Sequence, residues 1–473
     1  MKRREMLGAV GAATLASISG DGMAAVARPG SSRNKREFEP DKFEKKDMKL
    51  GNDHFLSATN PLATADQRDL EALALRIIQA PEIKKAREIS TWRLKILTGR
   101  DATAEAWSSF DSVMEEWIYH NALMAVNFDP NYPKVLRRWF APPHEWFGMK
   151  VPGSRGFGGI SPDTTYTLIP IDNNARFEIS GRRFEPSPVD VQFSLSANAL
   201  TTITVANLEW RTMQFNPDGT FVITLDPEPA NGRHNHIQTG PDARLLFIRD
   251  VRADWREVPN AYLVRRLDPP LMPPMTFQQM VERAMRYIIE DVAGCYPFMT
   301  MTNTTEINNI PPPFATGTLG GLVTQMMCLA RLKIADDEAY VLTVNPGGAK
   351  HHVIPVVNFW LCGLNFWDHT SSMNSRQSVP NADGTTTYVV SLKDPGVHNW
   401  VDTVGLHEPR LQMRWHALPD KPPAGGGPSV KGELVKLADL KKVLPAEMKW
   451  VTAAERKQQL AERLETFSLR NVV

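Results

Sequence analysis

The spacing of hydrophobic residues changes along the chain and divides it into segments of different structure. From residue 66 to residue 129, apolar positions recur every three or four residues, as on one face of an amphipathic helix. Pro81 and Gly99 interrupt this pattern, so it predicts three helices. After Pro152, apolar and polar residues alternate between Gly, Pro and Asn punctuation, which is typical of short strands.

Helical spacing returns over residues 277–289 and 319–334, and strand patterns resume over 339–418. A Pro/Gly-rich stretch at 422–428 precedes a charged segment at 452–467 that predicts a last helix. The expected organisation is therefore a signal peptide (1–27), a disordered linker (28–60), a helical cap (61–150), a first β unit (151–270), a helical connector (271–338), a second β unit (339–420), and a linker with a C-terminal helix (421–473).

The second β unit repeats the first at an offset of about 165 residues. The turn sequence at 216–220 returns at 381–385, the polar loop at 234–239 returns at 398–403, and the strand at 244–249 returns at 409–414. In both turns an Asp-Gly pair supplies the positive φ of a tight hairpin. We therefore predict an α+β fold, with a helical N-terminal cap and two related antiparallel β-sandwich-like units joined by helices. The pattern does not decide whether these units stack or lie side by side.

The N-terminus has the features of an export signal. Paired arginines, Arg3 and Arg4, precede a stretch of small apolar residues and an Ala-Val-Ala site that ends at Ala27. We expect the twin-arginine export machinery as a partner and a periplasmic or secreted location. The apolar stretch is interrupted by Gly and Ser, so we expect no stable membrane span in the mature chain. The alternative is a chance basic N-terminus on a cytoplasmic protein.

Composition excludes several classes of function. Lys and Arg number 54 against 53 Asp and Glu, so no basic field favours nucleic acid. Three scattered cysteines do not make a disulfide framework. The sequence lacks a Walker loop, a Rossmann fingerprint and a Gly-x-Ser-x-Gly elbow, so we expect no nucleotide cofactor and assign no other cofactor.

One loop resembles a known family. The run Asp-Pro-Gly-Val-His-Asn-Trp-Val-Asp-Thr at 394–403 resembles the signature of the bacterial family catalogued as domain of unknown function 1214. Segments 161–166, 177–181 and 254–257 agree with other motifs of that family, and the resemblance covers residues 60–470. It implies metabolism of apolar or xenobiotic compounds and supplies no catalytic residues. His236 departs from the pattern, because the family tends to place Trp there.

The same loop carries the first candidate site. His398, Asn399, Trp400 and Asp402 combine a general base, an amide, an aromatic face and a carboxylate within five residues. The alternative is structural: the amide and the carboxylate would satisfy the backbone of a turn, while Trp400 fills space between sheets. The equivalent Asn235 in the first unit favours this second interpretation.

Other candidates lie in the first unit. Asp163 and Tyr166 could form an acid pair at a pocket mouth, although Pro-Asp-Thr-Thr before a strand is also an ordinary turn. His234 and His236 lie on one side of an extended strand, but no carboxylate or Cys follows at ligand spacing, so we predict no metal site.

Three functions are open at this point. The first is an enzyme acting on an apolar or aromatic small molecule by acid–base or hydrolytic chemistry. Its candidate catalytic residues are His398 and Asp402, and its candidate ligand-binding residues are Asn399, Trp400, Tyr166, Asp163, His234 and Asn235. The second is a non-catalytic module that binds a hydrophobic ligand or a carbohydrate on exposed Trp, and the third is a structural protein of the envelope.

Overall fold

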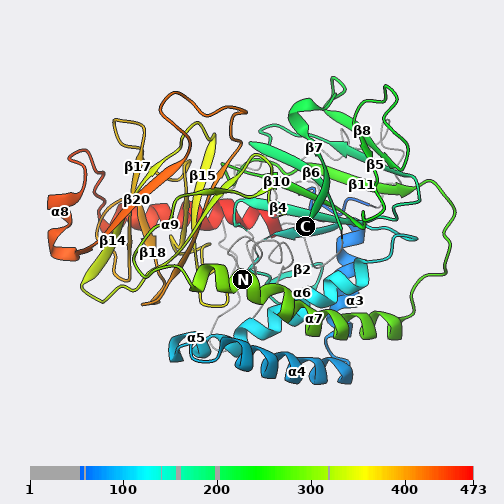
Figure 1. The fold of residues 1–473 in the computed structure, drawn as a ribbon, viewed down its shortest axis with the longest axis horizontal. Coiled ribbons are helices and arrows are strands. Elements are labelled where there is room, and N and C mark those ends of the chain that lie inside the picture. The colour runs from blue at the N-terminus through cyan, green and yellow to red at the C-terminus, as the bar shows by residue number, and fades with distance from the viewer. Residues whose placement is uncertain are drawn as a thin grey trace, which may run out of the picture.

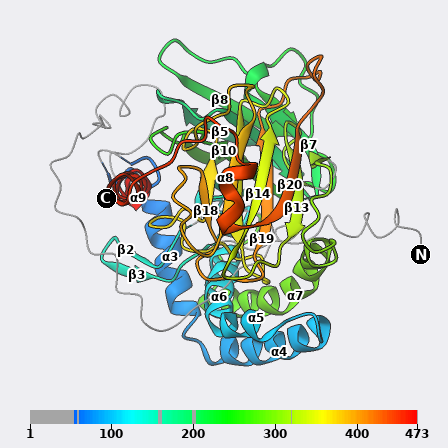
Figure 2. The same cartoon turned by 90° about the vertical axis from the view of Figure 1, so that its left-hand side faces the viewer.

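The computed structural model describes residues 54–57, 60–139, 141–155, 161–197, 203–317 and 320–471. The predicted signal peptide and most of the predicted linker lie outside these residues. In the described part, two β units lie side by side, and a layer of helices runs along one edge of both (Figures 1 and 2).

The N-terminal region is helical, as predicted, but it contains four helices instead of three. They are α3 (Ala65–Ile77), α4 (Pro81–Thr98), α5 (Ala104–Ser108) and α6 (Phe110–Asn127). Pro81 does not interrupt a helix but occupies the first position of α4, where its missing N–H has no helical partner to lose. Thr64 caps α3 by accepting the Gln67 N–H, and Gly99 ends α4 with a positive φ.

Each β unit contains a five-stranded and a four-stranded sheet. In the first unit the orders are β1-β4-β10-β6-β7 and β11-β5-β8-β9. The strands are β1 (Leu136–Trp139), β4 (Thr164–Pro170), β5 (Phe177–Arg182), β6 (Asp190–Ser196), β7 (Thr204–Glu209), β8 (Thr220–Asp226), β9 (His236–Gln238), β10 (Leu245–Val251) and β11 (Ala261–Arg266). A small hairpin of β2 (His144–Trp146) and β3 (Met149–Val151) precedes β4.

The second unit repeats this order strand for strand: β12-β13-β19-β15-β16 and β20-β14-β17-β18. Its strands are β12 (Phe314–Ala315), β13 (Met326–Arg331), β14 (Glu338–Asn345), β15 (His351–Val357), β16 (Ser372–Asn374), β17 (Thr386–Ser391), β18 (Trp400–Asp402), β19 (Arg410–His416) and β20 (Ser429–Lys436). Pairing is antiparallel except for one short pair in each unit, β8 with β9 and β17 with β18. The two units therefore share one strand order, as the predicted duplication requires.

Three boundaries of the prediction were wrong. The first β unit begins before residue 151, inside the predicted helical cap, because β1 pairs with β4. Residues 319–334 are not helical, since β13 occupies Met326–Arg331; its interior is an apolar run buried on both faces, which periodicity alone cannot distinguish from a helix. In the described part of the connector, the one α-helix is α7 (Phe277–Asn303). The second unit also continues beyond residue 420, because β20 pairs with β14. This edge strand is largely exposed and charged, so it gives a weak strand pattern.

Equivalent asparagines fix the same loop in both units. Asn235 bonds the backbone N–H and C=O of Gln214 at 2.8 and 2.7 Å, and Asn399 bonds those of Val379 at 2.9 and 2.8 Å. Asn399 also donates to the Thr387 carbonyl at 2.9 Å. Each asparagine therefore ties the loop before a hairpin to the start of the next short strand.

The C-terminal segment crosses from the second unit to the first. Thr452 and Glu455 form a capping box at the start of α9 (Ala453–Ser468), which confirms the predicted helix. In Figure 1, α9 runs behind the second unit and ends against the first. The other helical segments of the described residues are α8 (Leu440–Val443) and the 3₁₀ turns η1 (Trp210–Thr212), η3 (Leu437–Asp439) and η4 (Leu469–Asn471).

Each sandwich has its own hydrophobic core, and a third core joins helices α3, α4, α6 and α7 to the outer face of the five-stranded sheets. Tyr166, Leu168 and Phe247 of the first unit belong to this third core. Among the described residues, no helix combines the length and apolar character needed to cross a membrane.

The two loop asparagines give a matched test of the duplication. We expect Asn399→Ala to lower the free energy of unfolding by about 2–3 kcal/mol, because it removes the hydrogen bonds to the partly buried Val379 N–H and C=O and to the buried Thr387 C=O. Asn235→Ala, at the half-buried equivalent, should cost about 1 kcal/mol. Chemical denaturation measures both; equal costs would contradict this account of the two loops.

Candidate functional site

Asp163 lies at the junction between the two β units and is completely buried. Its carboxylate accepts three hydrogen bonds: from Trp255 Nε1 at 2.7 Å, from His351 Nε2 at 2.9 Å and from Asn374 Nδ2 at 3.1 Å. Trp255 belongs to the first unit, whereas His351 and Asn374 belong to the second. One carboxylate thus connects the two copies of the repeat.

These partners keep Asp163 ionised. Burial by itself would raise the pKa of the carboxyl group, but the hydrogen bond and charge of His351, with the bonds from Trp255 and Asn374, hold that pKa below its usual value. The ionised carboxylate accepts the Nε2–H of His351. The other ring nitrogen of His351, Nδ1, lies 3.0 Å from Ser375 Oγ. Asp163, His351 and Ser375 therefore form a hydrogen-bonded chain of carboxylate, imidazole and hydroxyl.

Tyr166 lies three residues beyond Asp163, on the face of β4 that points away from the first sandwich core. The strand order β1-β4-β10 places Arg138 on one side of Tyr166 and Arg249 on the other. Both arginines are almost entirely buried, at 3% and 5% exposed. The Tyr166 ring stacks on Phe247, with centroids 5.7 Å apart, and its hydroxyl accepts the Ser161 N–H at 2.8 Å.

The second unit adds Arg414 and His416 on β19. Arg414 occupies the position in the repeat that Arg249 occupies in the first unit, and its charge acts on Tyr166. The His416 ring stacks on His351, with centroids 5.7 Å apart. Neither ring nitrogen of His416 has a hydrogen-bond partner among the described residues, and burial holds its pKa well below the usual range. His416 is therefore a neutral imidazole inside the junction.

We define the junction site as Asp163, Tyr166, Arg138, Arg249, His351, Ser375, Arg414 and His416. Two of the eight predicted site residues, Asp163 and Tyr166, lie in it.

The two predicted catalytic residues do not come together. His398 Nε2 contacts the Gln377 carbonyl at 3.2 Å, and its backbone is held by Lys449. Asp402 instead pairs with His369 Nδ1 at 2.7 Å and accepts the Val404 N–H at 2.7 Å. The Asp402 carboxylate therefore closes a turn and bonds His369, and the structure shows no His398–Asp402 pair.

The other predicted ligand-binding residues are used by the fold. Asn399 and Asn235 hold the backbone contacts described above. Trp400 is 8% exposed, packs with Val341 and Leu440, and donates its indole N–H to the Ser391 carbonyl, so it offers no exposed platform for a sugar. His234 is exposed on a loop of the first unit. His236, two residues later, is hydrogen-bonded to the Thr224 hydroxyl and to the Glu228 carbonyl.

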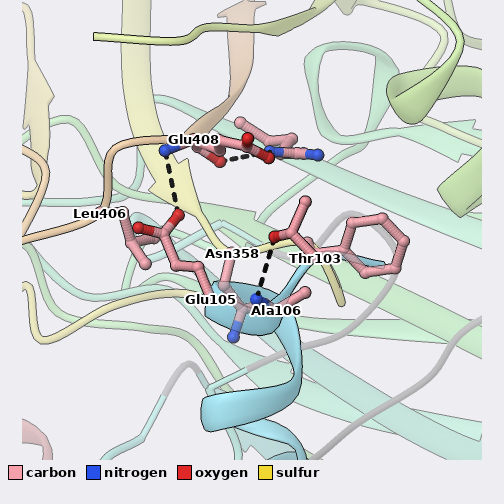
Figure 3. A pocket seen from close by; sticks show the side chains of 8 residues that line it. Thr103, Glu105, Ala106, Asn358, Leu406 and Glu408 are labelled. Carbon is pink, nitrogen blue, oxygen red and sulfur yellow. Dashed lines mark hydrogen bonds and ion pairs between the residues drawn. The ribbon is translucent and has the colours of Figure 1, made fainter. Parts of the chain in front are cut away.

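A shallow surface pocket lies elsewhere, between α5 and the second unit (Figure 3). Glu105 and Glu408 line it. The Glu105 carboxylate already accepts the backbone N–H groups of His407 and Glu408, at 2.9 and 3.0 Å. The pocket contains none of the predicted site residues, and its acidic group is engaged in holding a loop.

Sequence reasoning missed most of the junction site. The matched arginines, Arg249 and Arg414, stood in the aligned strands of the repeat and were the available signal. Ser375, His351 and Arg138 lie far apart in sequence and outside any local motif, so only the tertiary fold brings them to the junction.

The comparisons with known proteins support the fold. No family model matches the chain, and no curated protein matches it. A crystal structure of an uncharacterized protein from Burkholderia cenocepacia is similar with a TM-score of 0.63 at 20% identity, covering 78% of this chain and 100% of that one. A protein from Vibrio parahaemolyticus reaches a TM-score of 0.36 at 12% identity, covering 58% and 90%. The Burkholderia similarity shows a shared fold.

The pH dependence of the free energy of unfolding tests the role of Asp163 between the two units. Because the folded-state pKa of Asp163 lies below its unfolded value of about 3.9, its ionised form stabilises the fold above that pH and this stabilisation is lost on acidification. We expect Asp163→Asn to cost about 3 kcal/mol at neutral pH and to reduce the loss of stability as the pH falls below about 4.

The exposed Asp111→Asn variant is the control and should keep the wild-type pH dependence. Urea denaturation at each pH measures both variants. An Asp163→Asn protein that loses stability in acid as steeply as the wild type would contradict the assignment.

Proposed function

We propose that this chain is an exported protein that binds a small organic anion, with an apolar or aromatic body, at the junction between its two β units. The observation that supports this most is the pair of buried guanidinium groups beside Tyr166. Arg249 contacts only neutral partners, Ser194 Oγ at 3.4 Å and the Gly320 carbonyl at 2.5 Å. Arg138 has no hydrogen-bond partner for Nε and Nη2 among the described residues.

Among the described residues, no carboxylate forms an ion pair with Arg138 or Arg249. Burial lowers the pKa of Arg138 and of Arg249 to about 10, so both remain protonated at neutral pH. Asp291 is close enough to act on Arg138, but burial raises the pKa of that carboxyl group well above its usual value. That shift weakens Asp291 as a counterion for Arg138, and its Oδ2 already accepts the Asn121 amide N–H at 3.0 Å. Uncompensated buried cations cost several kcal/mol each, and a bound anion would remove that cost.

The surroundings favour an apolar body for this anion. The guanidinium carbon of Arg249 lies 4.2 Å from the centroid of the Phe247 ring, and Phe247 stacks on Tyr166. Leu168 and Leu245 lie on the same side of the sheet and share the core formed with the helices. Cationic groups beside an aromatic wall are the arrangement that a carboxylate on an aromatic or aliphatic body fits best.

Sequence patterns support the rest of the proposal. The paired arginines and Ala-Val-Ala site at the N-terminus favour twin-arginine export and a periplasmic or secreted location. The resemblance to domain of unknown function 1214 favours the metabolism of apolar compounds.

Isothermal titration with benzoate and hexanoate tests the proposed ligand class, with benzamide and hexanamide as neutral counterparts. We expect the acids to bind and the amides not to bind. Arg249→Gln and Arg138→Gln should each weaken binding about tenfold or more, equivalent to about 1.4 kcal/mol. The exposed arginine variant Arg376→Gln should bind as the wild type does. Amides that bind as tightly as acids, or arginine variants that bind unchanged, would contradict the proposal.

A second candidate function is hydrolysis, and the Asp163–His351–Ser375 chain favours it. Its distances of 2.9 and 3.0 Å are those of a base that can accept a serine proton while a carboxylate orients it. It ranks second because the N–H groups of Arg376 and Gln377, which follow Ser375, are bonded to Asn374 Oδ1. These groups are not free to stabilise an oxyanion.

Labelling with a fluorophosphonate probe tests this chemistry directly. If Ser375 is activated, the wild type becomes labelled, Ser375→Ala is not labelled, and His351→Gln is labelled at least tenfold more slowly. The control is Ser378→Ala, because Ser378 lies near Ser375 but is not part of the Asp163–His351–Ser375 hydrogen-bond chain. This variant should be labelled as the wild type is. Labelling that survives in Ser375→Ala would place the reactive group elsewhere.

A further inference from the structure

A second pair of buried arginines lies where the C-terminal segment meets the first unit. Arg252 follows β10, and its backbone N–H donates to the Asp163 carbonyl at 2.8 Å. Arg470 lies in η4, and its Nη1 donates to the Pro162 carbonyl at 2.6 Å. The two side chains therefore approach the same short segment from different parts of the chain. They are 2% and 1% exposed.

Both guanidinium groups have the same two atoms without a partner. Nε and Nη2 of Arg252, and Nε and Nη2 of Arg470, make no hydrogen bond to any described residue. These two atoms form the edge of a guanidinium that binds an oxyanion through two parallel hydrogen bonds. Two such edges, fully buried and unused, occur at one place.

The carboxylates around Arg252 have other partners. Asp163 accepts from Trp255, His351 and Asn374, as described above, and Asp250 accepts from Tyr262 and Asn260. Glu257 accepts the Ala253 N–H at 2.9 Å. The charge of Arg252 adds to burial in lowering the pKa of Arg470, so the two guanidinium groups are close enough to repel each other. The charges of Asp163, Asp250, Asp254 and Glu257 still act on Arg252, and the charge of Asp163 acts on Arg470. None of these carboxylates, however, bonds the Nε or Nη2 atoms of either arginine.

We propose that a small oxyanion, such as sulfate, phosphate or a carboxylate, binds between Arg252 and Arg470. Each arginine offers its Nε and Nη2 edge to the anion. This site shares no residue with the junction site, so it does not depend on the function proposed above.

The bound anion would fasten the C-terminal segment to the first unit. The guanidinium carbons of Arg470 and Arg463 lie 5.1 and 4.5 Å from the centroid of the Trp255 ring. Asn60 donates to the Arg470 carbonyl at 2.8 Å, so η4 also contacts the N-terminal segment. Occupation of the site should therefore stabilise the packing of three distant segments.

Thermal unfolding of the whole mature chain tests the site, with sodium sulfate or phosphate compared with sodium chloride at matched ionic strength. Sulfate strengthens folding of any protein by exclusion from its surface, so the comparison is between variants. We expect the melting temperature of the wild type and of the exposed control Arg376→Gln to rise several degrees more in sulfate than that of Arg470→Gln or Arg252→Gln. Equal rises in all four proteins would overturn the proposal.

Two further measurements cover the case in which a glutamine variant does not fold. Arg470→Lys and Arg252→Lys keep the charge but lose the two-atom edge, so they should also lose the extra rise. Equilibrium dialysis with radiolabelled sulfate should show one more bound anion per wild-type chain than per Arg470→Lys chain. Phosphate should displace it if the site takes free inorganic anions, and benzoate if the site takes the carboxylate of an organic molecule. A wild-type chain that retains no sulfate, phosphate or benzoate would refute the site.

Discussion

The buried carboxylate of Asp163 is the constraint on which the relation of the two β units depends. A buried negative charge without hydrogen-bond donors would destabilise the fold. Three donors, from both units, bond the Asp163 carboxylate and offset this cost. Because His351 and Asn374 come from the second copy, satisfying the carboxylate fixes the second unit against the first. The same contact orients His351 and so determines what Ser375 and His416 face.

The duplication explains why polar chemistry collects at this junction. Each sandwich buries one face of its five-stranded sheet in its own core and turns the other face toward the opposite unit and the helices. Arg249 and Arg414 occupy equivalent positions on these second faces. The two equivalent arginines thus contribute positive charge from the sheets of both units. Residues that differ between the copies, such as Phe247 and Gln412, make the facing surfaces of the two sheets chemically different.

Much of the fold could be predicted from the sequence, because local patterns carry it. Asp-Gly turns, strand alternation and the repeated loops predicted two related units, and the charged segment at 452–467 predicted the last helix. Strand β13 was mistaken for helix because both its faces are buried, and β20 was missed because it is an exposed edge.

The candidate site was harder to predict for a physical reason. The motif-like loop with His398, Asn399 and Trp400 is distinctive because it must make the same backbone contacts in each copy, so its regularity reflects structure. The junction site depends on residues brought together from Arg138 to His416, and no spacing in the sequence encodes their contact. Asp163 and Tyr166 were found because they lie beside an identifiable turn, but their partners were not.

The central claim is that the buried arginines beside Tyr166 hold an anion. Crystals of the protein soaked in sodium bromide would show this most directly, because bromide can be located by its anomalous scattering. The account predicts a bromide peak in contact with the guanidinium groups of Arg138 and Arg249. Ordered water at that position, with bromide confined to the protein surface, would contradict it.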